Sequence, residues 1–136
     1  MAEFYAEAGF TLNRVHAAEA FAAILADKRL GYAWLIQASS KTVGYLVVTF
    51  VFNMEYGGLN AFVDDLYVQA PFRNRGLATK ALAEARRFCV ARDIRAMSVE
   101  VGRDNIEAQG VYRRNGFVAT ERQLLGLRLA DPTHIV

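Results

Sequence analysis

The stretch that decides the fold is Val63-Asp64-Asp65-Leu66-Tyr67-Val68, followed after a short loop by Arg73-Asn74-Arg75-Gly76-Leu77-Ala78. The first six residues end an apolar run that begins near Leu59, and such a run predicts a strand. The second six are polar and rich in arginine, and a helical pattern follows them. A strand that gives way to a helix through a glycine-containing loop is typical of proteins that combine a sheet with covering helices.

The segment that begins at Gly76 is the most clearly amphipathic part of the chain. Its apolar residues share one helical face and its charged residues lie opposite, which predicts a helix packed against a sheet. A short strand is predicted at residues 97–101, and the crossover is long enough to make it parallel to the strand that ends at Val68. Residues 105–114 predict a shorter helix that stops at Asn115-Gly116.

Upstream of this region the pattern predicts a helix and an antiparallel meander. Residues 16–26 carry apolar side chains at helical spacing, with Asn13 as the expected cap. Strands are predicted at residues 32–38, 42–52 and 59–68, joined by short turns. A final pair of strands is expected at residues 117–119 and 123–129. The first residues could be the end of a helix or an irregular arm.

Composition limits the kinds of protein that this chain can be. Its 136 residues and 15.1 kDa suit a single domain spanning residues 1–136. A hydrophobic content of 54% with 22% charged residues excludes a disordered chain. The net charge of +2 is too balanced for a protein that coats nucleic acid. The longest apolar run, residues 45–52, is far shorter than the roughly 18–20 residues of a membrane helix, so neither nucleic acid nor membrane is an expected partner.

The cysteine and histidine content argues against disulfides and metal. Cys89 is the single cysteine, so no internal disulfide can form, and with only His16 and His134 no zinc-like cluster is predicted. We expect Cys89 to lie in the core and His16 to have no catalytic role. No signal-peptide pattern is visible, which favours a cytoplasmic location.

The loop from Arg73 to Ala78 is a candidate anion site. The start of a helix leaves backbone N–H groups unpaired and carries partial positive charge. Gly76 and Ala78 place no large side chain over these amides, and Arg73 and Arg75 add donors suited to phosphate oxygens. Because P-loop and dinucleotide-binding patterns are both absent, the expected phosphate ligand is not a nucleoside triphosphate. The alternative is a solvated loop in which Gly76 only permits a turn.

A second motif lies on the short helix. Asn105, Ala108 and Tyr112 are separated by three and four residues, which places them on one helical face. If that face lines a cleft, Asn105 offers an amide and Ala108 leaves room. Tyr112 then brings a phenol that is protonated at neutral pH and able to donate a proton. The alternative is a core tyrosine whose hydroxyl reaches solvent.

Together these motifs resemble the GNAT N-acetyltransferase superfamily. Arg73-x-x-Gly76-x-Ala78 resembles its acetyl-CoA pyrophosphate loop, and Asn105-x-x-Ala108-x-x-x-Tyr112-x-x-x-Gly116-Phe117 resembles its second motif. The likeness covers residues 32–129. It implies an α/β (α+β) fold with a mixed, mostly antiparallel sheet flanked by helices. Only about ten residues precede the first expected helix, so the usual first strand is expected to be missing.

The resemblance implies acetyl-CoA as the acetyl donor and no metal. Main-chain groups of residues 66–68 would meet the acetyl and pantetheine portions, residues 74–79 would cradle the pyrophosphate, and residues 105–108 would contact the pantetheine arm. The implied binding residues are Leu66, Tyr67, Val68, Arg73, Asn74, Arg75, Gly76, Leu77, Ala78, Thr79, Asn105, Ile106, Glu107, Ala108 and Tyr112.

The resemblance also implies catalytic roles. Tyr112 would protonate the departing thiolate, and residues 63–68 look most like the branch acting on diamines, polyamines and small amines, in which Asp64 matches the candidate base. Ordinary carboxyls are weak bases, so burial or the paired charge of Asp65 has to raise one pKa, or a water relays the proton. Strict alternation points the two aspartates to opposite faces unless a bulge intervenes, and both could merely solvate a strand end. The N–H of Val68 is the natural donor to the carbonyl oxygen.

The sequence therefore favours an acetyl-CoA-dependent transfer of acetyl to the primary amine of a small molecule, by direct attack in a ternary complex. The alternatives are a peptide or protein amine as acceptor, or a non-catalytic CoA-binding dimeric module. Glu55 in the meander turn could attract a cationic acceptor or simply be solvated. A homodimer is expected, because a missing first strand bares a sheet edge and apolar residues such as Phe4 and Phe10, with Tyr5, lack an obvious place.

Overall fold

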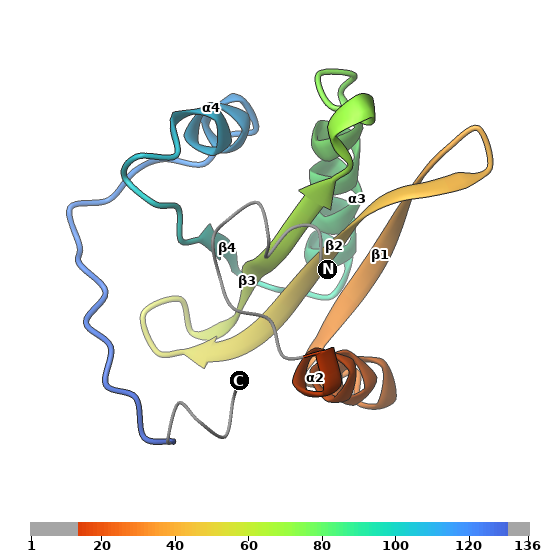
Figure 1. Ribbon diagram of the computed structural model, residues 1–136. Coiled ribbons are helices and arrows are strands. Elements are labelled where there is room, and N and C mark those ends of the chain that lie inside the picture. Colours follow the sequence, from red (N-terminus) through yellow and green to blue (C-terminus); the bar gives the residue numbers. More distant parts are fainter. Residues whose placement is uncertain (1–13, 131–136) are drawn as a thin grey trace.

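One mixed sheet organises the molecule (Figure 1). The computed structural model of the protein describes residues 14–130. Its elements are α2 (Arg14–Ala26), β1 (Gly31–Ala38), β2 (Lys41–Asn53), β3 (Gly58–Val68), the 3-10 helix η1 (Ala70–Phe72), α3 (Leu77–Ala91), β4 (Ala96–Val99) and α4 (Ile106–Arg114). The strand order is β1-β2-β3-β4, with β4 parallel to β3 and the other pairs antiparallel. The predicted fold class is confirmed.

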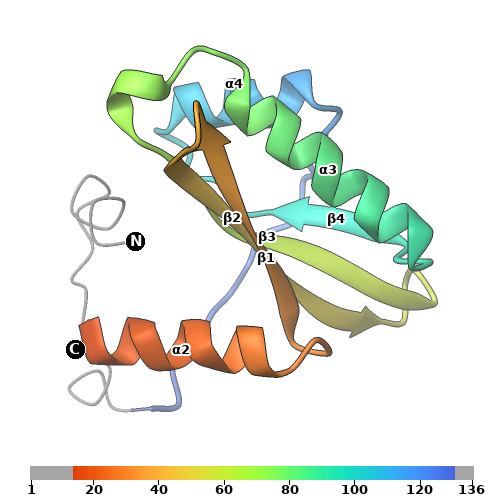
Figure 2. The same cartoon turned by 90° about the vertical axis from the view of Figure 1, so that its right-hand side faces the viewer.

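Strand β2 is buried on both faces, which explains its continuous apolar sequence. All six residues from 43 to 48 are buried. Leu46 and Val48 face the main core, whereas Tyr45 and Val47 face a smaller cluster that includes Phe21 of α2. Figure 2 shows α3 on one side of the sheet and α2 on the other. A strand covered on both sides needs apolar residues at every position rather than at alternate ones.

Helix α3 packs its small residues against the sheet. Ala81, Leu82 and Ala85 are buried there, and Cys89 is 2% exposed, as predicted for a core residue. Burial raises the pKa of the Cys89 thiol. Because a thiolate rather than a thiol is the nucleophile, this environment makes Cys89 unreactive.

The structure departs from the sequence prediction after α4. Residues 117–119 and 123–129, predicted as a last pair of strands, form no strand in the described part of the chain. Apolar alternation is not sufficient for a strand, because its backbone also needs a hydrogen-bonding neighbour. The predicted cap Asn13 and the apolar residues at positions 4, 5 and 10 lie outside the described residues.

Candidate active site

A cleft opens where β3 and β4 separate. Their parallel pairing ends at Val63 and Val99, whereas β3 continues to Val68. Beyond Val63, no described strand pairs with the side of β3 that faces away from β2. A strand edge of this kind offers N–H and C=O groups to an extended ligand.

Backbone groups of Leu66 and Val68 point to this open edge. Gln69 donates its N–H to the carbonyl of Val43 at 2.8 Å, so residues 69 and 43 form a hydrogen-bonded pair between β3 and β2. Hydrogen-bonded and non-hydrogen-bonded pairs alternate along antiparallel strands. The N–H of Val68 therefore points away from β2, in the direction that its predicted role requires.

A β-bulge in β3 gives the two aspartates different environments. Val48 of β2 pairs with Val63, but Val47 pairs with Asp65, so Asp64 is the additional residue. Asp65 is 6% exposed, whereas Asp64 lies at the surface. The alternative that both carboxylates merely solvate a strand end is therefore wrong for Asp65.

Electrostatics couple Asp65 to Tyr112. Burial, and after it the charge of Asp64, raises the pKa of Asp65 to about 6. Burial, and after it the charge of Asp65, raises the pKa of Tyr112 to about 12. At neutral pH the cleft therefore holds an ionised carboxylate and a protonated phenol near each other, which are a proton acceptor and a proton donor.

The start of α3 forms an anion cradle. Gly76 occupies the N-cap position in the left-handed conformation, with φ 77° and no side-chain cap. The N–H groups of the first turn consequently have no carbonyl partner within the helix. A Cβ placed on Gly76 would meet no atom within 4 Å, so the space over these amides is open. Open amides at the positive end of a helix suit a phosphate group.

The two loop arginines have different surroundings. The Nε of Arg73 donates to the carbonyl of Val68 at 2.7 Å, and its guanidinium lies 5.4 Å from the ring centre of Tyr67. Arg73 thereby ties the loop to the end of β3. Arg75 lies over the ring of Phe72 at 5.4 Å and does not line the cleft.

Helix α4 forms the facing wall. The Oδ1 of Asn105 accepts the N–H of Ala108 at 3.1 Å and so caps the helix. Asn105, Ala108 and Tyr112 all line the cleft, which confirms that they share one face. The Nδ2 of Asn115 donates to the Oγ1 of Thr79 at 3.2 Å, and this bond links the end of α4 to the start of α3.

The cleft has a volume of about 710 Å³ and gathers most of the predicted binding residues. All of them line it except Arg75 and Ile106, and Ile106 is 70% exposed. Sequence reasoning missed Phe72 and Val111, whose apolar character gave no functional signal. It also took Arg114 as solvated, although that residue lines the cleft.

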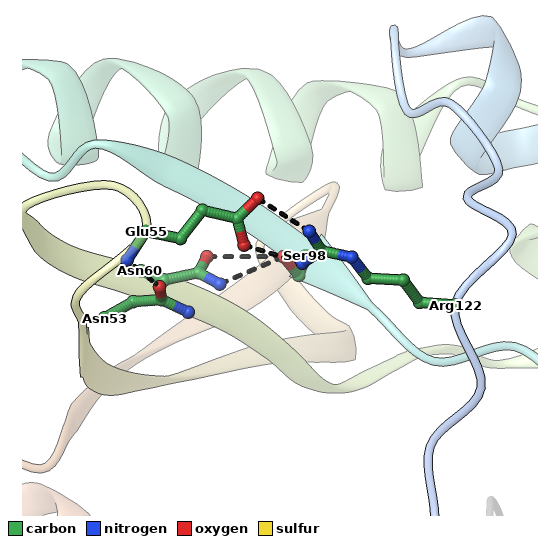
Figure 3. A network of polar contacts seen from close by, with 5 residues as sticks. All are labelled: Asn53, Glu55, Asn60, Ser98 and Arg122. Atoms are coloured by element: carbon green, nitrogen blue, oxygen red, sulfur yellow. Dashed lines mark hydrogen bonds and ion pairs between the residues drawn. The ribbon is translucent and has the colours of Figure 1, made fainter.

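Glu55 does not present a free carboxylate to a cationic acceptor. Its two carboxylate oxygens accept hydrogen bonds from Arg122 at 2.6 and 3.0 Å (Figure 3). These bonds lower the pKa of Glu55. The partner arginine compensates the charge that the predicted attraction depends on. The neighbouring bond from the Nδ2 of Asn60 to the Oγ of Ser98, 3.1 Å long, joins β3 to β4.

Within residues 14–130 no group of three or more histidine, cysteine or acidic side chains is placed to hold a metal ion. No helix of that part of the chain is long and apolar enough to cross a membrane.

A strand edge, an anion cradle and an acid–base pair around one cleft define a CoA-dependent acyltransferase. The profile of the Acetyltransferase (GNAT) family matches residues 1–117. The chain belongs to this family, and it is an acetyl-CoA-dependent acetyltransferase. A search of curated protein sequences found no match.

Several solved structures are similar over most of the chain. An integron cassette protein from the mobile metagenome of Cole Harbour Salt Marsh is 45% identical, with a TM-score of 0.86 over 97% of this chain and 82% of that one. AAC(6')-Iy, bound to a CoA-S-monomethyl-acetylneamine bisubstrate analogue, is 20% identical, with a TM-score of 0.76 over 87% and 82%. The aminoglycoside acetyltransferase meta-AAC0020, from an uncultured soil metagenomic sample, is 18% identical, with a TM-score of 0.76 over 94% and 84%.

Proposed function

We propose that the protein transfers acetyl from acetyl-CoA to the primary amine of a small molecule by direct attack in a ternary complex, and that residues 1–136 act as one catalytic domain. The observation that carries the proposal is the buried Asp65 close to Tyr112, at the point where β3 leaves β4. Transfer to an amine requires one proton to leave the amine and one to reach the thiolate, and these two groups can perform both transfers.

The shape of the cleft fits the acetyl donor. The open space over Gly76 and the unpaired amides of the first turn of α3 would hold the pyrophosphate. Leu66 and Val68 would exchange hydrogen bonds with the amide groups of the pantetheine arm, as an edge strand does with an added strand. Ala108 leaves room for that arm on the facing helix.

The chain's residues would then divide the chemistry. The amine nitrogen attacks the acetyl carbonyl carbon, a new C–N bond forms, and the C–S bond breaks. The N–H of Val68 would stabilise the negative charge that develops on the carbonyl oxygen. Asp65 would take the proton from the amine, directly or through one water, and Tyr112 would donate a proton to the departing sulfur.

We infer that Asp65, rather than Asp64, is the base. The sequence resemblance placed that role on Asp64, but a proton acceptor works best when its pKa lies near the working pH. Burial raises the pKa of Asp65 to about 6. Asp64 remains the alternative, acting from the surface through a water relay.

The surroundings of Asp65 favour a small cationic acceptor. By alternation along β3, its side chain shares a sheet face with Tyr67, on the side that α2 covers. A partly enclosed carboxylate beside aromatic rings suits an ammonium group. We therefore propose diamines, polyamines or similar small amines as the acceptor class. Peptide or protein amines are the second candidate.

Thiol release from acetyl-CoA in the presence of an amine panel tests this proposal. The panel should contain a diamine, a polyamine, an aminoglycoside and a lysine-containing peptide. The aminoglycoside is included because AAC(6')-Iy and meta-AAC0020 share the fold. We expect amine-dependent release with a small amine, and acetylated product by mass spectrometry. Release only with the peptide would replace the small-molecule acceptor by a peptide.

A further inference from the structure

The outer edge of β4 is open, and an apolar groove lies beside it. Within the described residues, β4 pairs only with β3, so its other side has no strand neighbour. The adjoining groove of about 610 Å³ runs between α3, β4 and the end of α4. Leu82, Ile94, Met97 and Phe117 give it an apolar lining. An exposed strand edge next to apolar surface is a site for an added strand.

The chain carries a segment that suits this edge. Residues 123–130 follow α4 without helix or strand, and their four leucines are between 73% and 92% exposed. Leu125, Leu127 and Leu129 alternate with Gly126 and Arg128, so a strand made of these residues would have one apolar face. Several large apolar side chains exposed together mark a contact surface.

The segment has already passed its own β4 when it reaches these leucines. Arg122 binds Glu55, which lies in the turn between β2 and β3. The N–H of Arg95 donates to the carbonyl of Leu59 at 2.8 Å, so that turn lies beside the start of β4. Figure 1 shows the segment running from α4 along the β4 side of the sheet and on beyond the turn. To pair with its own β4, the segment would have to break this ion pair or double back.

We propose that residues 123–130 of one copy add as a strand to the open edge of β4 in a second copy, and that the exchange is reciprocal. The leucines of the added strand fill the groove beside β4. Both copies use the same edge and the same segment, so the contact closes as a two-fold dimer. This interface differs from the β1 side of the sheet, where the sequence led us to expect one. It does not depend on the identity of the acceptor amine.

Light scattering on the full chain and two proline variants tests the exchange. Proline cannot donate to a sheet, so Leu127→Pro should prevent strand addition without disturbing a core, because Leu127 is 85% exposed. Thr120→Pro places the same change at an exposed residue before the exchanged stretch and is the control. We expect twice the 15.1 kDa chain mass for the wild type and Thr120→Pro, and the single chain mass for Leu127→Pro.

Hydrogen exchange distinguishes exchange between copies from pairing within one chain. Amides of residues 96–99 and 123–130 should be protected together in the wild type and lose protection together in Leu127→Pro. A dimer that survives in Leu127→Pro, or a wild type that stays at 15.1 kDa, overturns the proposal. Protection of both segments in a monomer would also overturn it, because the chain would then cover its own edge.

Discussion

At the scale of single residues, the bulge in β3 matters more than the charge of either aspartate. It exposes Asp64 and buries Asp65, so two adjacent residues of one type have different environments. The sequence could show the pair but not the bulge, because β2 and β3 pair without any local signal for the extra residue. The choice between the two carboxylates therefore required the structure.

The pH dependence of turnover should identify the base. For the wild type, kcat/KM should rise with pH through one ionisation near 6, because Asp65 has to lose its proton to act. Asp65→Asn should abolish this rise and reduce kcat/KM by about 10²–10⁴-fold at pH 8. Asp64→Asn is the matched control. Removing its charge should lower the pKa of Asp65 and shift the rise to lower pH, while the plateau remains. The reverse behaviour of the two variants would assign the base to Asp64.

The role of Tyr112 can be separated from its packing. Tyr112→Phe keeps the ring that packs edge-on against Phe117, with 5.4 Å between the ring centres, but removes the phenol proton. Loss of a positioned acid should lower kcat by about 10²–10⁴-fold, whereas affinity for acetyl-CoA should change little. Steady-state kinetics and calorimetry on one preparation measure both quantities. Normal kcat in this variant would mean that another group protonates the thiolate.

At the scale of secondary-structure elements, the sequence predicted most of the fold because periodicity and burial agree. Helix α3 shows one apolar face, and the meander strands are separated by turn residues. The segment after α4 failed as a prediction for a physical reason. Its alternation is that of a strand, but no described neighbour supplies the hydrogen bonds. Similarly, the pairing of Glu55 with Arg122 joins residues far apart in sequence, which no local pattern reveals.

The start of α3 should be the site of the donor's pyrophosphate. Gly76→Trp fills the open space over the amides and should reduce acetyl-CoA affinity below detection by calorimetry. Gly57→Trp is a matched control, because Gly57 also has positive φ, at 65°, and also has no atom within 4 Å of a Cβ, but it lies in the distant β2–β3 turn. Both variants carry similar backbone strain. Equal affinities in two folded variants would remove the pyrophosphate from this loop.

At the scale of the whole molecule, the cleft exists because the sheet is unevenly paired. Strand β2 is covered on both faces and has a strand on each side, so it supplies a rigid centre. Strand β3 shares that rigidity along one edge but is open along the other beyond Val63. Donor binding then needs no rearrangement of the core, and Asp65 is held at the boundary between a packed interior and the cleft. Such a position gives catalysis at a cost in stability.

This cost leads to a prediction about folding. The pKa of Asp65 is raised to about 6 in the folded protein, from an ordinary value of 3.8. Between these two pH values the folded state binds more protons at this residue than the unfolded state does, so its contribution to stability falls as pH rises from about 4 to 6. Asp27 has the opposite sign, because hydrogen bonds from Arg29 lower its pKa to about 2, and its effect is confined to pH below its ordinary value of 3.8. The window between pH 4 and 6 therefore isolates Asp65.

Asp65→Asn should consequently stabilise the fold at neutral pH while it reduces activity. Thermal melts of the wild type and the variant should nearly coincide at pH 4 and diverge as pH rises, with the variant more stable by on the order of 1–3 kcal/mol at pH 7. Asp64→Asn should give a smaller gain, because it removes only the neighbouring charge and leaves the burial of Asp65 unchanged. A constant difference between wild type and Asp65→Asn at every pH would mean that Asp65 titrates in the folded state as it does in the unfolded chain. Burial would then not be what prepares this carboxylate for proton transfer.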